Sequence, residues 1–217
     1  LDAAIRSGIP ARDIQVLAPM YRGAAGIDAI NQLMQELLNP LQKGQISFEA
    51  SQFHYRTSDK VIHLVNDAEV NVFNGDLGYI TDLIPAKYTE SKQDEMMIDF
   101  DGNEVSYPRN EWYKIRLAYA MSIHKSQGSE FPVVILPITS ASKRMLERNL
   151  IYTAITRAKS KLILLGELQA FDYATKHIGT ARKTYLIERF SDLTESSEER
   201  NEPVLEDDKK TQFSYVR

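Results

Sequence analysis

The chain has 217 residues, of which 43% are hydrophobic and 26% charged, a composition typical of a folded domain with a buried core. It contains no cysteine and four scattered histidines, which excludes disulfide and thiolate chemistry and argues against a metal site. No run of 18 apolar residues or signal-peptide pattern is present, so the sequence predicts neither a membrane span nor export. Because the chain begins with Leu1 rather than Met, we expect a fragment of a longer protein.

Charge is distributed unevenly along the chain, although the formal net charge is only −4. Residues 191–217 carry eight acidic and four basic side chains, and we expect this polar segment to be a disordered tail. Residues 118–190 carry eleven basic against five acidic side chains. This local excess is compatible with phosphate binding and equally with a solvated helical face.

Residues 1–52 have the pattern of the first part of an α/β domain. Gln15–Ala18 reads as a short buried strand, and apolar residues then recur at helical spacing from Ile27 to Leu38. Asn39–Pro40 is expected to end that helix. Strand, loop and helix in this order form the usual building block of an α/β sheet.

Residues 53–116 follow a different pattern and predict a small inserted β-barrel. Strand-like runs occur at 60–65, 77–81 and 95–100, and Asn74-Gly75 and Asp101-Gly102 are strong turn signals. Several short strands in about sixty residues are typical of such a barrel.

Two aromatic residues near the end of this barrel, Trp112 and Tyr113, have two interpretations. They could stack on nucleic-acid bases, a contact worth about 1–3 kcal/mol each. For Trp112 the favoured interpretation is a packing residue inside the barrel.

Residues 117–190 resume the α/β pattern. The apolar run 132–137 predicts a strand buried on both faces, and 161–166 predicts a second buried strand. Between them, apolar residues from 146 to 155 mark a helix, and 170–174 suggest another. The chain has no G-x-x-x-x-G-K-[ST] phosphate loop and no strand ending in paired acidic residues, so it lacks a complete site for hydrolysing a nucleotide.

Two polar segments carry candidate chemistry. Residues 122–131, Ser-Ile-His-Lys-Ser-Gln-Gly-Ser-Glu-Phe, are mostly polar and directly precede a buried strand. They offer hydrogen-bond donors and a glycine that permits close approach of a ligand, or they form only a capped polar turn. Residues 149–159 form an amphipathic helix ending in Thr-Arg-Ala-Lys. Its arginine could bind phosphate oxygens with its planar fork, or act only as a cation near a helix C-terminus.

Together, the segment 122–131, the apolar strand after it and Tyr-Thr-Ala-Ile-Thr-Arg-Ala-Lys at 152–159 resemble motifs V and VI of superfamily 1 helicases. The closest likeness is the RecD-type branch, which includes the exodeoxyribonuclease V alpha chain. Residues 16–28 resemble the start of that family's second motor domain, and Asn-Gly-Asp-Leu-Gly at 74–78 resembles the entrance to its inserted SH3-like barrel. The resemblance runs from about Asp13 to Phe190.

The resemblance implies a RecA-like second motor domain that lacks the phosphate loop and carries an SH3-like barrel. ATP with Mg²⁺ would bind in the cleft against an upstream RecA-like domain, which would supply the Mg²⁺ ligands. Arg157 would be the catalytic arginine finger, and the other residues facing the nucleotide would be Gln127, Gly128 and Glu130. Tyr152 and Thr153 would orient the finger.

For the nucleic acid, the resemblance implies that single-stranded DNA contacts Ser122, His124 and Lys125, and less firmly Arg22. Lys125 could instead serve the nucleotide. The parent protein would be a cytoplasmic bacterial enzyme that moves 5′ to 3′ in DNA repair or recombination, alone or with subunits of a nuclease complex. Two alternatives remain open from the residues: a DNA-binding accessory domain that never meets ATP, and a motor that acts on RNA.

Overall fold

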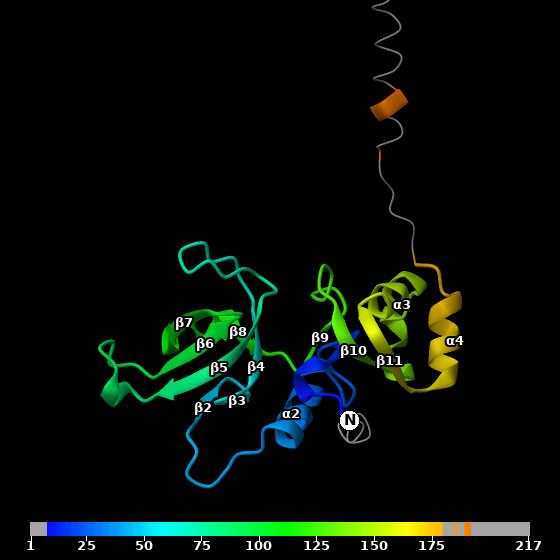
Figure 1. Cartoon of the computed structure of the whole chain (residues 1–217). Helices are drawn as coiled ribbons and strands as arrows, with labels where there is room; N and C mark the ends of the chain where they lie inside the picture. Colours follow the sequence, from blue (N-terminus) through cyan, green and yellow to red (C-terminus); the bar gives the residue numbers. More distant parts are fainter. Residues whose placement is uncertain (1–7, 180–184, 186–188, 192–217) are drawn as a thin grey trace, which may run out of the picture. The chain divides into compact units, whose positions relative to one another are not determined.

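The computed structural model describes residues 8–179, 185 and 189–191 of the chain (Figure 1). The first of two compact units ends at Gly179 and contains every helix and strand named below. Almost all of the expected acidic tail, from residue 192 onward, lies outside the described residues.

A four-stranded parallel sheet forms one part of this unit. Its order is β11-β10-β1-β9, so the chain places β1 between two strands that follow it much later in the sequence. Parallel strands with helical connections confirm the predicted α/β class. The bounds are Ile14–Ala18 for β1, Ala120–Ser122 for β9, Phe131–Ile138 for β10 and Ala158–Gly166 for β11.

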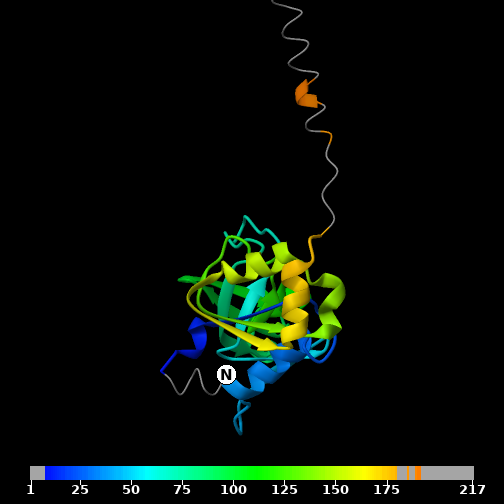
Figure 2. The ribbon, with the colours of Figure 1, turned by 90° about the vertical axis from the view of Figure 1, so that its right-hand side faces the viewer.

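Helices lie on both faces of the parallel sheet. Alternate side chains of β10 point to opposite faces, so Leu136 packs with α3 (Arg148–Ile155) and α4 (Leu168–Lys176), whereas Ile135 packs in the cluster that contains α2 (Ile27–Leu38). In the turned view of Figure 2, α4 lies in front of the strands. The predicted helices are confirmed, except that the helix expected over 149–159 ends at Ile155, and Ala158 and Lys159 belong to β11. None of the described helices is both long and apolar enough to cross a membrane.

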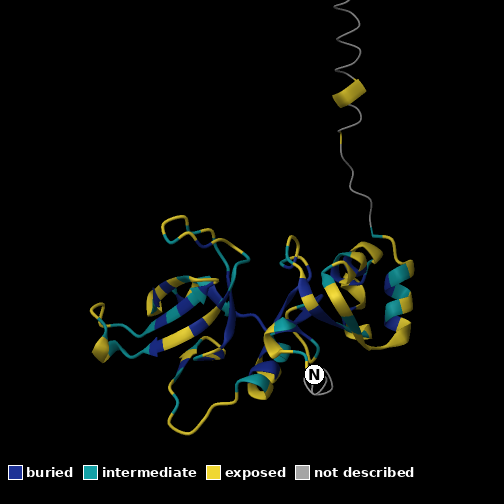
Figure 3. Cartoon of the chain, in the orientation of Figure 1, coloured by how far each residue is buried: buried dark blue, intermediate teal, exposed yellow. Residues whose placement is uncertain are grey.

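The prediction of a buried strand at 161–166 is wrong, because β11 is the edge strand of the sheet. Among the described strands it pairs only with β10. Leu164 and Leu165 are 43% and 50% exposed, as the yellow stretches of β11 in Figure 3 indicate. Leu165 lines an apolar hollow of about 540 Å³ together with Leu33 and Leu37 of α2.

Helix α2 buries polar residues as well as apolar ones. The side-chain amide of Asn31 makes a reciprocal pair with the backbone of Ala120 in β9, with N···O distances of 2.9 and 2.8 Å. Gln35 is also buried, whereas Leu33 and Leu37 are mostly exposed. The helix is therefore oriented by hydrogen bonds to β9, which the apolar spacing alone did not indicate.

The β-barrel is inserted between α2 and β9, and its main sheet is antiparallel with the order β7-β6-β5-β4-β8. The predicted turn at Asp101-Gly102 is confirmed, with φ values of 54° and 92° that suit a two-residue hairpin. A two-stranded hairpin precedes the sheet. The bounds are Ser47–Ala50 for β2, Phe53–Arg56 for β3, Lys60–His63 for β4, Leu77–Ile84 for β5, Glu95–Phe100 for β6, Asn103–Pro108 for β7 and Ile115–Leu117 for β8.

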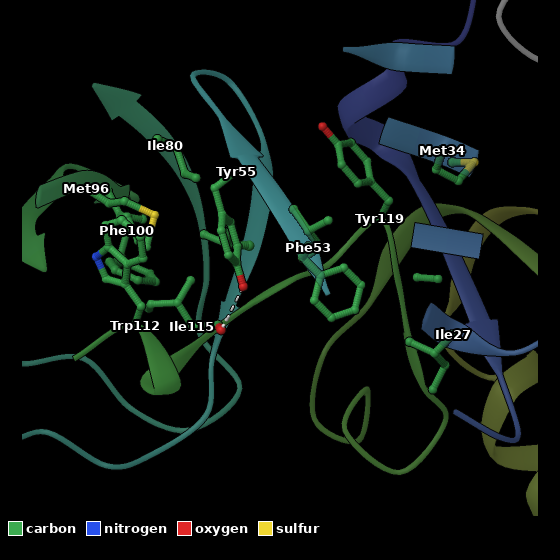
Figure 4. Close-up of a cluster of buried hydrophobic side chains, with 14 of the residues drawn as sticks. Ile27, Met34, Phe53, Tyr55, Ile80, Met96, Phe100, Trp112, Ile115 and Tyr119 are labelled. Carbon is green, nitrogen blue, oxygen red and sulfur yellow. Dashed lines mark hydrogen bonds between the residues drawn. The ribbon is translucent and has the colours of Figure 1, made fainter. Parts of the chain in front are cut away.

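Trp112 is a packing residue of the barrel, as the sequence favoured. It lies in the 3₁₀ helix η3 (Arg109–Lys114), is 4% exposed and stacks on Phe48 at a ring-centroid distance of 5.4 Å. Its indole Nε1 donates a hydrogen bond to the carbonyl of Tyr107 at 2.8 Å. Figure 4 draws the ring among buried apolar side chains, and the Arg109 guanidinium lies 4.9 Å from its centroid, so Phe48 and Arg109 cover the ring.

Candidate nucleotide and nucleic-acid sites

The candidate residues gather at opposite edges of the parallel sheet. Ala18 and Ser122 are paired and are the last residues of their strands, so the loops that follow them leave from the carboxyl edge. Phe131 and Ala158 are paired at the start of their strands, so the residues just before them lie at the amino edge. Arg157 and Glu130 therefore lie at the amino edge, whereas the predicted DNA residues Ser122, His124 and Lys125 lie at the carboxyl edge.

At the amino edge, Arg157 is held by three neutral acceptors. Its Nε donates to the carbonyl of Thr153 at 3.2 Å, one terminal nitrogen to the carbonyl of Ser129 at 3.1 Å, and the other to the hydroxyl of Thr156 at 3.1 Å. Within the described part of the chain, no carboxylate forms an ion pair with Arg157. A guanidinium has five N–H donors, so this one is oriented while it keeps its full charge and two donors for a ligand.

The surroundings of Arg157 suit both roles that the sequence suggested, binding of phosphate oxygens and stabilisation of a helix C-terminus by a cation. Its bond to the Thr153 carbonyl lies at the C-terminal end of α3, where a cation is favourable. Thr153 therefore orients the guanidinium through its backbone. The Tyr152 ring is 69% exposed and contributes only its carbonyl, which accepts a hydrogen bond from the Thr156 amide.

Of the other predicted nucleotide residues, Glu130 directly precedes β10 at this edge. Gln127 stays in the turn after β9, where its backbone amide donates to the His124 carbonyl at 3.3 Å. Gln127, Gly128 and Glu130 are exposed. Gly128 has φ of +89°, a backbone conformation that favours glycine, and no other atom approaches its open side within 4 Å. The Glu130 carboxylate lies 3.5 Å from the Lys159 ammonium, and both side chains are more than half exposed. This pair is therefore weak and leaves Glu130 available.

At the carboxyl edge, the segment after β9 forms a compact turn. Ser122 is only 8% exposed, and its hydroxyl accepts a hydrogen bond from the Lys125 amide at 3.3 Å. Ser126 is fully buried and donates from its hydroxyl to the Ile123 carbonyl at 2.7 Å. Both serines shape the turn, and His124 projects from it as an exposed side chain.

Lys125 connects this turn to the barrel. Its Nζ donates to the side-chain oxygen of Asn74 at 3.1 Å, in the loop where the sequence predicted the barrel entrance. Burial lowers the pKa of Lys125, and the nearby positive charge of Arg116 lowers it further. Two cations therefore lie close together here, an arrangement that an anionic ligand would stabilise.

Arg116 of β8 is a candidate that the sequence analysis missed. Its guanidinium lies over the rings of Tyr21 and Phe53, with centroid distances of 5.3 and 5.6 Å, and 3.6 Å from the Asp28 carboxylate. A single arginine at the end of a barrel carries no sequence signal, because only the fold brings it beside the loop that follows β1.

Arg22 lies exposed on that loop, which folds back tightly onto the start of α2. Gly26 makes the fold possible, since a Cβ there would come within 2.5 Å of the Tyr21 carbonyl oxygen. Tyr21, Arg22 and Arg116 line one hollow of about 580 Å³. Arg22 and Arg116 thus line the same hollow, whereas Lys125 is hydrogen-bonded to Asn74 of the barrel.

Two protein families match parts of this chain. Residues 117–165 match the UvrD-like helicase C-terminal domain, and residues 30–100 match the ATP-dependent RecD-like DNA helicase SH3 domain. The chain belongs to the RecD-type superfamily 1 helicases, with the RecA-like fold and SH3-like barrel of their C-terminal half.

Among its relatives is the ATP-dependent RecD2 DNA helicase of Deinococcus radiodurans, with 36% identity over 176 residues, which are 81% of this chain and 23% of the relative. The RecBCD enzyme subunit RecD of Mycolicibacterium smegmatis is 28% identical over 152 residues, 70% of this chain and 25% of the relative. The chain therefore spans about a quarter of the length of these relatives. A Pif1 helicase crystal structure from Candida albicans gives a TM-score of 0.49 at 17% identity, covering 82% of this chain and 50% of that one.

Proposed function

We propose that this chain supplies the second motor domain of an ATP-dependent DNA helicase that moves along single-stranded DNA. In this proposal Arg157 is the arginine finger, which stabilises the charge that spreads over the γ-phosphoryl group as it is transferred. Gln127, Gly128 and Glu130 approach the same nucleotide. A preceding RecA-like domain of the same protein supplies the phosphate loop and the Mg²⁺ ligands, since neither motif occurs in this sequence.

The observation that carries the proposal is the environment of Arg157. Three neutral oxygen acceptors fix its guanidinium, and no carboxylate in the described chain neutralises it. An arginine that only stabilised the fold would gain most from a charged partner at this half-buried position. A fixed but unneutralised guanidinium beside an open glycine turn is instead suited to a phosphate.

The residues at the carboxyl edge support the proposed binding of single-stranded DNA. Arg22, His124 and Lys125 offer donors to a DNA backbone, and Ser122 shapes the turn that presents two of them. The names of its relatives favour DNA as the substrate. Movement 5′ to 3′ and a role in repair or recombination are part of the proposal because the family resemblance implies them. The names of the relatives also make a complex with nuclease or helicase subunits a reasonable assembly for the whole protein.

The test is DNA-stimulated ATP hydrolysis by three proteins: this chain, a longer protein in which a RecA-like domain precedes it, and the longer protein with Arg157→Ala. We expect hydrolysis only in the longer unmutated protein, and nucleotide binding in both longer proteins. Unchanged hydrolysis in the Arg157→Ala protein would remove the finger from the proposal.

A longer protein that binds single strands but does not hydrolyse ATP would favour a non-catalytic binding module. Preference for RNA over DNA of the same sequence would favour an RNA motor, because the 2′-hydroxyl is the chemical difference between them.

A further inference from the structure

The loop between β4 and β5 carries the Asn-Gly-Asp turn that the sequence singled out, and hydrogen bonds fix its backbone. Residues 73–76 form a β-turn in which Gly75 has φ of +107°, a value that glycine adopts at little cost. The four consecutive amides of the turn have acceptors at 2.7–3.0 Å: the Asp76 carboxylate for Phe73, the Asn66 side chain for Asn74, the His63 carbonyl for Gly75 and the Phe73 carbonyl for Asp76. The turn therefore holds its side chains at defined positions.

The Asn74 side chain extends from this turn to the parallel sheet. Its oxygen accepts a hydrogen bond of 3.1 Å from the Lys125 ammonium, 51 residues further along the chain. The backbone amide of Lys125 donates to Ser122, to the carbonyl at 3.0 Å and to the hydroxyl at 3.3 Å. Both ends of the lysine are thus held, one by the turn after β9 and the other by the barrel.

The acceptor that holds Lys125 is an amide, although the same loop contains carboxylates. Lys114, a lysine of the barrel, is paired with Asp67 at 2.8 Å and with Glu111 at 2.7 Å, and its side chain is only 15% exposed. Two carboxylates neutralise that lysine, as suits one that stabilises the fold. Lys125, in contrast, forms no ion pair with any described residue, so its charge is not neutralised.

Lys125 can therefore bind an anion and keep its bond to Asn74. An ammonium has three N–H donors, of which Asn74 uses one. A long side chain loses rotamer freedom when a ligand fixes it, and an acceptor that fixes it beforehand removes this cost from binding. Arg157 is held in the same way by neutral oxygens, so both cations are oriented and neither is neutralised.

We propose that Asn74 is a positioning residue, which holds the Lys125 ammonium where it meets a phosphate of single-stranded DNA. This inference rests on the proposed function, because it takes Lys125 to be one of the DNA contacts. Asn74 itself does not contact DNA. The barrel then acts on DNA through the turn after β9, and displacement of its β4–β5 loop releases Lys125.

The experiment measures the affinity of this chain for an oligothymidylate of about 16 nucleotides over a series of salt concentrations. Lys125→Ala should weaken binding and reduce the slope of log affinity against log salt by about 0.7, the value for one phosphate contact with a single strand. Asn74→Ala should weaken binding about 2- to 10-fold, the cost of ordering one long side chain, and leave the slope unchanged because the ammonium remains.

A double variant shows whether Asn74 acts through Lys125. Asn74→Ala combined with Lys125→Ala should bind no more weakly than Lys125→Ala alone, since without the ammonium there is nothing left to orient. If the two losses add, Asn74 contributes independently of Lys125 and the proposal is wrong.

Asn74→Asp separates positioning from a purely structural role in the turn. Asp has nearly the shape of Asn and is also suited to turns, so the loop should keep its conformation. The new carboxylate would hold Lys125 and neutralise it, so the salt slope should fall by about 0.7, as in Lys125→Ala. If Asn74 only shaped the turn, this variant would bind as the wild type does.

Two matched controls come from the same barrel. Asn71 is exposed on the same loop, and Asn71→Asp adds the same charge at a side chain that does not bond Lys125, so it should reduce the slope much less than Asn74→Asp. An equal reduction would show general repulsion and overturn the positioning role. Asn110→Ala removes an exposed amide from η3 and should bind as the wild type does. A thermal melt of every variant checks that the barrel is folded.

The outcomes separate this inference from the proposed function. If Lys125→Ala weakens binding but folded Asn74→Ala and Asn74→Asp bind as the wild type does, the positioning role is wrong while the DNA contact stands. If Lys125→Ala changes neither the affinity nor the slope, Lys125 is not a DNA contact, and the proposed contact and its positioning residue fall together.

Discussion

The hydroxyl of Tyr119 donates a hydrogen bond to the buried carboxylate of Asp59 at 2.9 Å, and this bond joins the barrel to the parallel sheet. Asp59 directly precedes β4, and Tyr119 lies just before β9. The same carboxylate accepts hydrogen bonds from the side chains of Gln35 and Asn39 of the α2 region and from the backbone amide of Arg56. One acidic residue therefore ties together α2, the barrel and the connection to β9.

Asp59→Ala is predicted to lower the free energy of unfolding by roughly 3–5 kcal/mol, because three buried donors and one half-buried donor lose their acceptor. Asp59→Asn keeps one acceptor oxygen and should have a smaller effect. Urea unfolding measures both. Glu90→Ala, at an exposed carboxylate, is the control and should change stability by less than about 0.5 kcal/mol. If Asp59→Ala leaves the free energy of unfolding nearly unchanged, packing alone holds the barrel against the parallel sheet.

Lys60→Met is predicted to stabilise the protein at neutral pH. Lys60 is 5% exposed, and burial lowers the pKa of its ammonium to about 8. In the unfolded chain this pKa is about 10.4, so between these values the unfolded state binds more protons and wild-type stability rises with pH. At pH 7 the fold therefore carries the full penalty of a buried charge. The gain from the substitution should be roughly 1–3 kcal/mol at pH 7 and vanish near pH 10.5.

Urea unfolding of the wild type and Lys60→Met at several pH values tests this dependence. Lys43→Met, at an exposed lysine, should show no such pH-dependent difference. Subtracting the stability of the wild type from that of Lys60→Met at each pH removes the contributions of groups that titrate in both proteins. A loss of stability in Lys60→Met at pH 7 would show that the contact of Lys60 with the Phe131 ring and its bond to the Arg12 carbonyl outweigh desolvation.

Trp112→Ala is predicted to destabilise the barrel by roughly 3–5 kcal/mol, because it leaves a large cavity beside Phe48. Trp112→Phe keeps most of the ring and should lose about 1–2 kcal/mol, including the bond to the Tyr107 carbonyl. Folded Trp112→Phe protein should bind single-stranded DNA as the wild type does. Weaker binding with an unchanged melting temperature would show that the indole contacts DNA.

Arg157→Lys, in a protein with the preceding RecA-like domain, is predicted to reduce ATP hydrolysis nearly as much as Arg157→Ala, by roughly 10³- to 10⁵-fold. An ammonium cannot contact Thr153, Ser129 and Thr156 in the fixed plane that the guanidinium uses. Steady-state hydrolysis is the measurement, and Lys161→Ala, an exposed cation on β11, is the control. If Arg157→Lys retained activity, a point charge would be sufficient for ATP hydrolysis and the planar guanidinium would not be required.

Several elements were predictable because the signal is local. The helix at 27–38 has apolar spacing and a closing Asn-Pro, the strand at 95–100 ends at an Asp-Gly turn, and both were confirmed. The family resemblance was equally readable, since motifs V and VI are contiguous segments. The placement of Trp112 in a core also followed from its size and surroundings.

The exposure of β11 and the role of Asn31 could not be predicted from the local sequence. Leu164 and Leu165 look like core residues in sequence, and only strand order shows that they lie at a sheet edge. Asn31 is polar at a position that the apolar pattern passes over, yet it fixes α2 to β9. Periodicity records which side chains share a face but not which neighbour covers that face.

The sequence by itself determined the α/β class, the inserted barrel and the family, because each depends on residues close together in the chain. Only the tertiary structure decided that Arg116 lies over Tyr21 and that Asp59 joins two sheets. These relationships depend on how separate segments pack. Packing is set by hydrogen bonds and side-chain volumes that act across long stretches of chain, and no local pattern encodes them.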